Sequence, residues 1–378
     1  QRSRQSSLPT SASILPMAEV QHPRIMRAAQ IVEYGKPYQL TERPTPIIRD
    51  HELLVQVKAA GFCHSDLQVL NGRFKSPLGL IPSHEPAGCI VQIGHRCHPR
   101  WKLGQRVGVL NFKNACDQCA GCKTAKQALN HLDPRYCDNR ETAGFQNDGA
   151  FAEYMVADPE TTVLLPDSLS FEQAAPLMCA GATVWGSLER ATQGLEQGNV
   201  VAIVGIGGLG HLGIQFAKGL GFRTIAIDSR PAGRRLANET SNPSLRPDLV
   251  IDSGSPDANR RIFEFTEGQG VAAAIVCTDS LIANAWALKI LRIGGSLGIL
   301  GLPAEQWRFE ADLIVFKQLA LRGTYVASTV ATERMMEVVS QHGIESHLAM
   351  ASFDDIPGIV DAYKDADFRG RLVVRISR

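Results

Sequence analysis

The stretch Val200-Val-Ala-Ile-Val-Gly205-Ile-Gly-Gly-Leu-Gly210 decides the fold of this chain. Its first five residues form a short, fully apolar run, which is typical of a parallel strand buried on both faces. In the turn that follows, the first glycine allows a tight bend and the second lets backbone N–H groups approach a pyrophosphate. The third lets the next helix pack closely on the strand. The candidate cofactor contacts are therefore Gly205, Gly207, Gly208, Leu209 and Gly210.

An acidic residue supports this interpretation of the glycine turn. Asp228 ends the next apolar strand, about twenty residues after Gly205. A carboxylate there accepts hydrogen bonds from the adenosine ribose hydroxyls and repels a 2′-phosphate, so we expect NAD rather than NADP. Arg230 and Arg234 could neutralise a 2′-phosphate, but an acid at the strand end normally outweighs them.

The pattern changes on either side of this unit. Downstream, helix-like and strand-like segments alternate, which predicts a doubly wound α/β domain over residues 180–321. Upstream, residues 31–109 contain short alternating apolar runs punctuated by Gly and Pro, which predicts a β-rich region. Phe171 to Ala191 looks like one helix between the two regions, and the tail after residue 322 returns to mixed structure.

Composition restricts the class of protein. A chain of 378 residues is long enough for two domains. Hydrophobic residues at 44% and charged residues at 20% are typical of a globular enzyme. The net charge of +1 argues against nucleic acid or anionic lipid as a partner. No stretch approaches the roughly 20 apolar residues of a membrane span, so we expect a small-molecule substrate and no membrane.

The N-terminus and the cysteines bear on the compartment. Nine cysteines is an odd number, and there is no signal-peptide pattern, which favours reduced thiols inside the cell. Residues 1–18 carry Arg2, Arg4 and five serines without an acid, a composition compatible with a mitochondrial transit peptide. A start at Met17 is the interpretation we favour. We therefore expect residues 1–25 to be a disordered or targeting extension, and the protein to be cytoplasmic, with the mitochondrion as the alternative.

Three short fragments together suggest a catalytic metal. They are Cys63-His64-Ser65-Asp66, Ser83-His84-Glu85 and Cys179-Ala-Gly-Ala-Thr183. Two thiolates and one imidazole hold Zn²⁺ with a fourth position left open for a substrate oxygen. Taken singly, a buried Cys is usually a small hydrophobic residue and a His a satisfied core residue. The three fragments are informative only together with the glycine turn.

With these motifs, residues 26–378 resemble the zinc-containing medium-chain alcohol dehydrogenases, and the shorter yeast-type members more than the longer liver-type ones. The resemblance implies that Cys63, His84 and Cys179 are the catalytic zinc ligands. It implies that Glu85 lies behind the metal as a transient ligand and that Asp66 orients His84. The implied substrate and cofactor contacts are Ser65 to the alcohol oxygen, His64 and Arg371 to the pyrophosphate, and Thr183 to the nicotinamide.

The chain departs from the family pattern at several places. Ser83 stands where glycine usually precedes the His-Glu pair. Gln68 stands where many members carry the histidine that ends the proton relay, and glutamine does not titrate near neutrality. Asn111 and Phe74 alter the aromatic walls of the yeast-type pocket, so the resemblance does not carry over ethanol specificity.

A second cysteine group predicts a structural zinc. Four thiolates close a tetrahedral site without an open position. The gap before the last cysteine is longer than the family's usual one, which indicates an insertion from Lys123 to Tyr136, and Asp117 or His131 are rival fourth ligands. Thiols without metal are the alternative. The four cysteines are Cys116, Cys119, Cys122 and Cys137, whereas Cys89, Cys97 and Cys277 have no partners and are expected to be packing residues.

The resemblance implies a GroES-like β-rich catalytic domain around a Rossmann domain. We assign residues 26–179 and 322–378 to the first, with a zinc lobe at 113–149, and residues 180–321 to the second. The predicted activity is hydride transfer between a primary or secondary alcohol and NAD, in a homotetramer by resemblance. The rivals are a polyol dehydrogenase, a zinc-free quinone or enoyl reductase, and a non-catalytic zinc-lobe binding module. Cys179 argues against the first, because those enzymes usually place a glutamate there.

Overall fold

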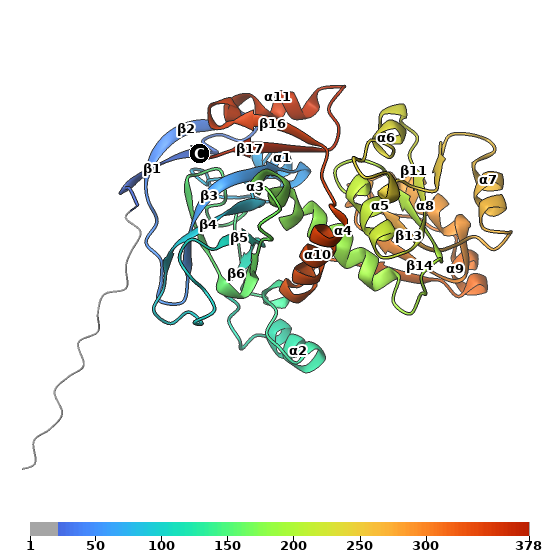
Figure 1. Cartoon of the computed structure of the whole chain (residues 1–378), viewed down its shortest axis with the longest axis horizontal. Coiled ribbons are helices and arrows are strands. Elements are labelled where there is room, and N and C mark those ends of the chain that lie inside the picture. The colour runs from blue at the N-terminus through green and yellow to red at the C-terminus, as the bar shows by residue number, and fades with distance from the viewer. Residues whose placement is uncertain (1–21, 378) are drawn as a thin grey trace, which may run out of the picture.

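The computed structural model describes residues 22–377, which form two units side by side (Figure 1). One unit is rich in β-strands and contains both the first and the last strands of the chain. The other is a parallel sheet covered by helices. The prediction for the N-terminal extension falls mainly on residues 1–21, which lie outside the described residues.

The apolar run at 200–204 is the centre of a six-stranded parallel sheet. The strand order is β12-β11-β10-β13-β14-β15, which is the Rossmann order with a reversal beside the first strand. All five residues of β10 are buried, as a strand covered by helices on both faces requires. The strands are β10 (Val200–Val204), β11 (Arg223–Ile227), β12 (Leu249–Ile251), β13 (Val271–Val276), β14 (Leu291–Ile299) and β15 (Ala320–Gly323). The helices are α5 (Gly210–Gly219), α6 (Pro231–Leu236), α7 (Ala258–Phe265), α8 (Leu281–Ile290) and α9 (Ala311–Lys317), with a 3₁₀ turn at Pro243–Leu245.

The β-rich unit is a mainly antiparallel sheet that the C-terminal strand completes. Its order is β16-β17-β3-β4-β5-β9, with β8 also paired to β3. Leu372 of β17 lies opposite Phe62 of β3, so the end of the chain reaches the strand that leads to Cys63. The strands are β3 (Leu53–Phe62), β4 (Pro86–Ile93), β5 (Arg106–Val109), β8 (Tyr154–Ala157), β9 (Thr162–Leu164), β16 (Leu348–Ser352) and β17 (Arg371–Arg375). Two further pairs are β1 (Ile25–Gln30) with β2 (Gln39–Pro44) and β6 (Phe112–Lys113) with β7 (Glu141–Thr142).

Short helices complete this unit. They are α1 (His64–Leu70), α2 (Ala120–Leu129) and α11 (Ile359–Lys364), with 3₁₀ turns at Pro134–Tyr136, Pro159–Thr161 and Phe353–Gly358. No helix in the described part of the chain has the length and apolar character needed to cross a membrane. The fold is the medium-chain dehydrogenase/reductase fold expected from the sequence.

The connection between the two units corrects one prediction. The continuous helix expected from Phe171 to Ala191 is three pieces: α3 (Phe171–Ala174), a 3₁₀ turn (Ala175–Met178) and α4 (Ala180–Ala191). Pro176 is the second residue of the 3₁₀ turn, and proline lacks the N–H that a continuing α-helix needs. Cys179 lies at the break with φ −127° and ψ −71°, outside helical geometry. We also propose that the Rossmann unit extends to Gly323, because β15 pairs with β14 up to that residue.

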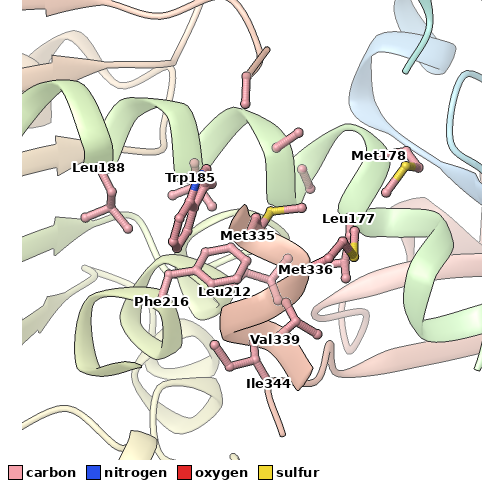
Figure 2. Packing of buried hydrophobic residues seen from close by; sticks show 14 of the residues in the cluster. Leu177, Met178, Trp185, Leu188, Leu212, Phe216, Met335, Met336, Val339 and Ile344 are labelled. Carbon is pink, nitrogen blue, oxygen red and sulfur yellow. The ribbon is translucent and has the colours of Figure 1, made fainter. Parts of the chain in front are cut away.

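The junction between the units has its own core. Side chains of α4, α5 and α10 (Thr329–His342) pack together there (Figure 2). Trp185 of α4 and Phe216 of α5 meet edge to face with ring centroids 5.4 Å apart, and Met335 of α10 is fully buried beside them. Helices from both sides of the sequence boundary therefore share one apolar cluster.

Removing Phe216 should open a cavity in this cluster. We expect Phe216→Ala to lower the free energy of unfolding by about 3–5 kcal/mol, because the lost side chain is fully buried. Ile47→Ala is the control, since Ile47 is 93% exposed. Denaturant unfolding of both variants checks the prediction, and equal, small effects would contradict it.

Candidate metal and cofactor site

Two cysteine side chains, one histidine side chain and one carboxylate converge at the edge of the β-rich unit. The ligand atoms of Cys63, His84, Glu85 and Cys179 all lie within 4.8 Å of one another. His84 Nε2 is 3.2 Å from Cys179 Sγ. Tetrahedral zinc with Zn–S and Zn–N bonds of about 2.0–2.3 Å needs ligand atoms roughly 3.5 Å apart, and the separation between His84 Nε2 and Cys179 Sγ is close to that value.

Each fragment reaches the site from the end of a regular element. Cys63 follows β3 and caps α1, whereas His84 and Glu85 come directly before β4. β3 and β4 are antiparallel neighbours, so the end of one strand and the start of the next lie together. Cys179 arrives from the other side, at the helix break before α4.

The serine in place of the family's glycine sits in strained backbone. Ser83 has φ +74°, a left-handed conformation that favours glycine. Its Oγ donates a hydrogen bond to Gly61 O at 2.8 Å, and its N–H donates to Asp66 Oδ1 at 3.2 Å. These bonds help to offset the strain, which explains how a serine is accommodated here.

Asp66 links the two fragments that carry the candidate metal ligands Cys63 and His84. It is fully buried, and its Oδ1 lies 3.0 Å from His84 Nδ1. Its Oδ2 accepts the N–H of Cys63 at 2.9 Å. A carboxylate on Nδ1 fixes the ring so that Nε2 faces the metal position.

The charges within the site are strongly coupled. A hydrogen bond from Cys179 holds the pKa of the Cys63 thiol well below its ordinary value, although burial acts the other way. That same bond, together with burial, raises the pKa of Cys179. Burial raises the pKa of Glu85 to about 7, against the attraction of Arg371. The two thiols therefore lose their first proton readily, and the proton that remains is shared between the sulfurs. Loss of this second proton costs free energy, which a bound cation would offset.

Glu85 lies behind this cluster rather than on its open side. It pairs with Arg371, while its Oε2 is buried and has no hydrogen-bond partner among the described residues. A Cβ at Gly61 would lie 1.9 Å from Oε2, so only glycine leaves room for this carboxylate. An unpartnered buried oxygen beside two sulfurs and an imidazole fits a metal ligand.

The second cysteine group also comes together. Cys116, Cys119, Cys122 and Cys137 have their sulfurs within 4.8 Å of one another. The Cys116–Cys137 and Cys119–Cys137 sulfur separations are 3.6 and 3.9 Å, close to the roughly 3.8 Å edge of a tetrahedral Zn–S₄ site. The side-chain amide of Asn139 donates to Cys116 and is the largest of the contacts that lower the pKa of Cys116 to about 6.

The rival ligands point elsewhere. Asp117 pairs with Lys126 at 2.5 Å, and His131 Nδ1 lies 2.9 Å from Leu129 O. Within residues 22–377 neither belongs to the four-cysteine group. Most of the inserted segment forms α2 and the 3₁₀ turn at Pro134–Tyr136, so the insertion is ordered structure.

The glycine turn has the shape of a phosphate cradle. Gly205 has φ +90°, and a Cβ at Gly210 would lie 2.1 Å from Gly205 O. A Cβ at Gly208 would lie 2.9 Å from Arg371 Nη1, so this arginine lies between the turn and Glu85. An arginine beside the N-terminus of α5 fits an anionic pyrophosphate.

Asp228 lies at the end of β11 as predicted, but its oxygens already have partners. Oδ2 accepts the N–H of Ile206 at 2.7 Å, and Arg230 pairs with both oxygens. The Arg230 side chain is 64% exposed, so it can move away, whereas the Ile206 bond is buried. A ribose would therefore compete with Arg230 for this carboxylate. Arg234 pairs with Asp252 instead.

A cleft of about 1870 Å³ joins the Cys63, His84 and Cys179 cluster to the glycine turn. It is lined by the predicted residues His64, Ser65 and Thr183, and by the altered positions Gln68, Phe74 and Asn111. Sequence analysis missed Phe145, whose ring lies 4.9 Å from that of His84, and Arg140, Tyr325 and Tyr363, which also line it. Cys277, expected only to pack, lines the cleft too, with a pKa that burial raises to about 12.

Comparison with known proteins identifies the class. Residues 49–167 match the family "Alcohol dehydrogenase GroES-like domain", and residues 208–341 match "Zinc-binding dehydrogenase". The chain is 33% identical over 353 residues to an alcohol dehydrogenase of Geobacillus stearothermophilus, covering 93% of this chain and all of that one. It therefore belongs to the zinc-containing alcohol dehydrogenases, which are oxidoreductases.

Solved structures share the fold. An alcohol dehydrogenase from Aeropyrum pernix superposes with a TM-score of 0.79 at 26% identity, over 92% of this chain and 99% of that one. A zinc-binding dehydrogenase from Sinorhizobium meliloti, solved with NADP bound, superposes with a TM-score of 0.81 at 24% identity, over 93% and 99%. These likenesses show the shared fold, and the match to a zinc-binding dehydrogenase family agrees with the two groups of zinc-type ligands in the described residues.

Metal content should report the two cysteine groups separately. We expect two zinc ions per chain in the purified protein, and one in each of Cys63→Ser and Cys119→Ser, because each change removes one thiolate of a different group. Mass spectrometry of the metal against protein concentration is the measurement. Two zinc ions in either variant would show that the replaced cysteine is not required to hold zinc.

Proposed function

We propose that this protein oxidises a primary or secondary alcohol to the aldehyde or ketone with NAD, and catalyses the reverse reaction. The observation that carries the proposal is the convergence of Cys63, His84 and Cys179 in the cleft that also contains the glycine turn. Glu85 does not line the cleft, so the donor set faces it with two sulfurs and one nitrogen. That arrangement suits a metal with one open position on the substrate side.

The side chains around this position have distinct proposed roles. Zinc, when bound, supplies a Lewis acid, and the nicotinamide accepts the hydride. Ser65 lines the cleft two residues after Cys63, and its proposed role is to accept the proton of the substrate hydroxyl. Asp66 hydrogen-bonds the His84 ring and its proposed role is to orient it. Thr183, in the first turn of α4, is the proposed contact of the nicotinamide.

The proton must then leave without a titrating relay residue. Gln68 lines the cleft in the position where many relatives carry histidine. Its amide can orient a water or a ribose hydroxyl but cannot hold the proton. We propose that Ser65 passes the proton towards solvent; a bound cofactor would supply a ribose hydroxyl near this route.

The choice of NAD rests on Asp228. Its carboxylate is 5% exposed and held in place by Ile206, so it presents a fixed negative charge at the end of β11. A 2′-phosphate would bring a second negative charge to this carboxylate, whereas ribose hydroxyls would replace the bonds of the exposed Arg230. His64 and Arg371 are the proposed pyrophosphate contacts.

Assembly into a homo-oligomer is also a proposal. β15 is an edge strand of the parallel sheet in the described chain, and exposed apolar side chains lie near it: Ile293 at 73%, Val315 at 66% and Phe316 at 79%. An open edge beside apolar surface favours a second copy of the chain as its cover. The tetramer, the closeness to yeast-type members and the cytoplasmic location stay predictions.

Loss of one catalytic thiolate should separate chemistry from cofactor binding. We expect Cys63→Ser to abolish turnover of every alcohol while NADH binding, followed by fluorescence titration, stays nearly unchanged. The reason is that Cys63 serves the metal position and the glycine turn lies apart from it. Loss of NADH binding in this variant would mean that the site is misassigned.

Loss of the strand-end acid should weaken cofactor discrimination. We expect Asp228→Ala to shift the NAD/NADP ratio of kcat/KM towards NADP by about tenfold or more, because charged hydrogen bonds of this kind contribute about 1.5–3 kcal/mol. Arg230 would then be free to pair with the 2′-phosphate. Asp228→Asn keeps the side-chain shape and should give the same direction. An unchanged ratio in both variants argues against the ribose contact.

A further inference from the structure

Two of the arginines that line the cleft, Arg140 and Arg190, form no ion pair among the described residues, and only Arg140 is half-buried. Arg230, Arg369 and Arg371 also line the cleft, and each pairs with a carboxylate. Arg140 makes no ion pair within the described residues. Its Nη1 donates to Cys137 O at 2.9 Å, and its buried Nε has no hydrogen-bond partner there. A half-buried cation with unmet donors is costly unless something else satisfies it.

Strand geometry directs this arginine into the cleft. Arg140 comes directly before β7, in which side chains alternate between faces. Thr142, two residues on, lines the cleft together with Arg140. Glu141, between them, is turned away and pairs with Lys113 at 3.7 Å. The acid next to Arg140 in sequence is therefore not its counter-charge.

The wall that carries Arg140 starts at the metal position. The Phe145 ring lies 4.9 Å from the His84 ring, and Phe74 packs on Phe145 at 5.2 Å. Further along the same segment, the Arg140 guanidinium lies 5.5 Å from the centre of the Tyr325 ring. Phe145 and Arg140 both line the cleft, so a substrate extending along this segment would find apolar rings beside the metal position and a cation elsewhere on the same wall.

Carboxylates are absent from this wall in the described structure. The acids that line the cleft are Asp228, Asp279 and Asp365, and none belongs to the segments that carry Phe145, Arg140 or Tyr325. Arg190 also lines the cleft without an acidic partner, but its side chain is exposed and so remains hydrated. The positive charge of Arg140 is thus the distinctive feature of this part of the cleft.

From these observations, and resting on the proposed alcohol dehydrogenase function, we propose that Arg140 binds a carboxylate at the far end of the substrate. The substrate class is an alcohol or aldehyde whose apolar chain ends in a carboxylate. The guanidinium pairs with the carboxylate through charge-assisted N–H···O bonds. The four-cysteine lobe then has a part in specificity, since the carbonyl of its ligand Cys137 fixes one nitrogen of Arg140.

The test compares ω-hydroxy carboxylates, from hydroxybutyrate to hydroxyoctanoate, with the neutral primary alcohols of equal chain length. The readout is the ratio of kcat/KM for each matched pair. We expect Arg140→Gln to lower the carboxylate-to-neutral ratio about 10- to 100-fold at the best chain length, mostly through KM. Arg140→Lys, which keeps the charge, should recover part of the loss. Calorimetric titration of ω-hydroxyhexanoate into each zinc-loaded protein should show the highest affinity for the wild type, a lower one for Arg140→Lys and the lowest for Arg140→Gln.

Arg190→Gln is the matched control, because it removes an equal charge from the cleft lining. An unchanged ratio in this variant, with a lowered ratio in Arg140→Gln, supports the proposal. Equal losses in both variants would indicate general attraction by the cleft and overturn it. An unchanged ratio in Arg140→Gln, with neutral alcohols still oxidised, overturns it and leaves the alcohol dehydrogenase function standing. If the wild-type protein oxidises no alcohol with NAD or NADP, the proposed function fails, and the calorimetric comparison alone decides on Arg140.

Discussion

The buried ion pair between Arg371 and Glu85 is the contact on which the site depends. Arg371 is 4% and Glu85 0% exposed at the side chain. Burial acts to lower the pKa of Arg371, but attraction from Glu85, Cys63 and Cys179 outweighs it and raises the pKa. Removing either partner would leave an uncompensated buried charge, which commonly costs several kcal/mol. The pair can form only when β17, from the end of the chain, is in place beside β3.

The same arginine connects the cofactor turn to the β-rich unit. The backbone N–H of Arg371 donates to the backbone carbonyl of His347 at 2.8 Å. The backbone N–H of His347 donates to His211 Nε2 at 3.2 Å. His211 Nδ1 lies 2.8 Å from Gly207 O. Burial lowers the pKa of His211 to about 4, so the ring is neutral at pH 7, with Nδ1 as donor and Nε2 as acceptor. The glycine turn and the residues around the metal position thus belong to one hydrogen-bonded network.

Local patterns in the sequence were enough for the sheet and the cofactor turn. A fully apolar run followed by glycines at this spacing is compatible with few structures other than a buried strand and a dinucleotide-binding turn. The observed strand order agrees with that prediction. The candidate metal ligands came from three motifs and the family resemblance that they carry, and the structure brings Cys63 and His84 together through antiparallel strands. The break at Cys179 was missed because residues 171–191 have helical character throughout, apart from Pro176.

What the sequence could not predict depends on pairing between distant segments. Nothing near Arg371 indicates that Glu85 is its partner, because β17 must first pair with β3. Likewise, Arg230 is near Asp228 in sequence, but the ion pair between them depends on the rotamer of Arg230, which the sequence does not give. Arg140 is informative for the same reason: its isolation follows from the alternation of β7, which sends Glu141 to Lys113 on the other face. A charge becomes a specificity determinant here because the fold has separated it from its nearest opposite charge.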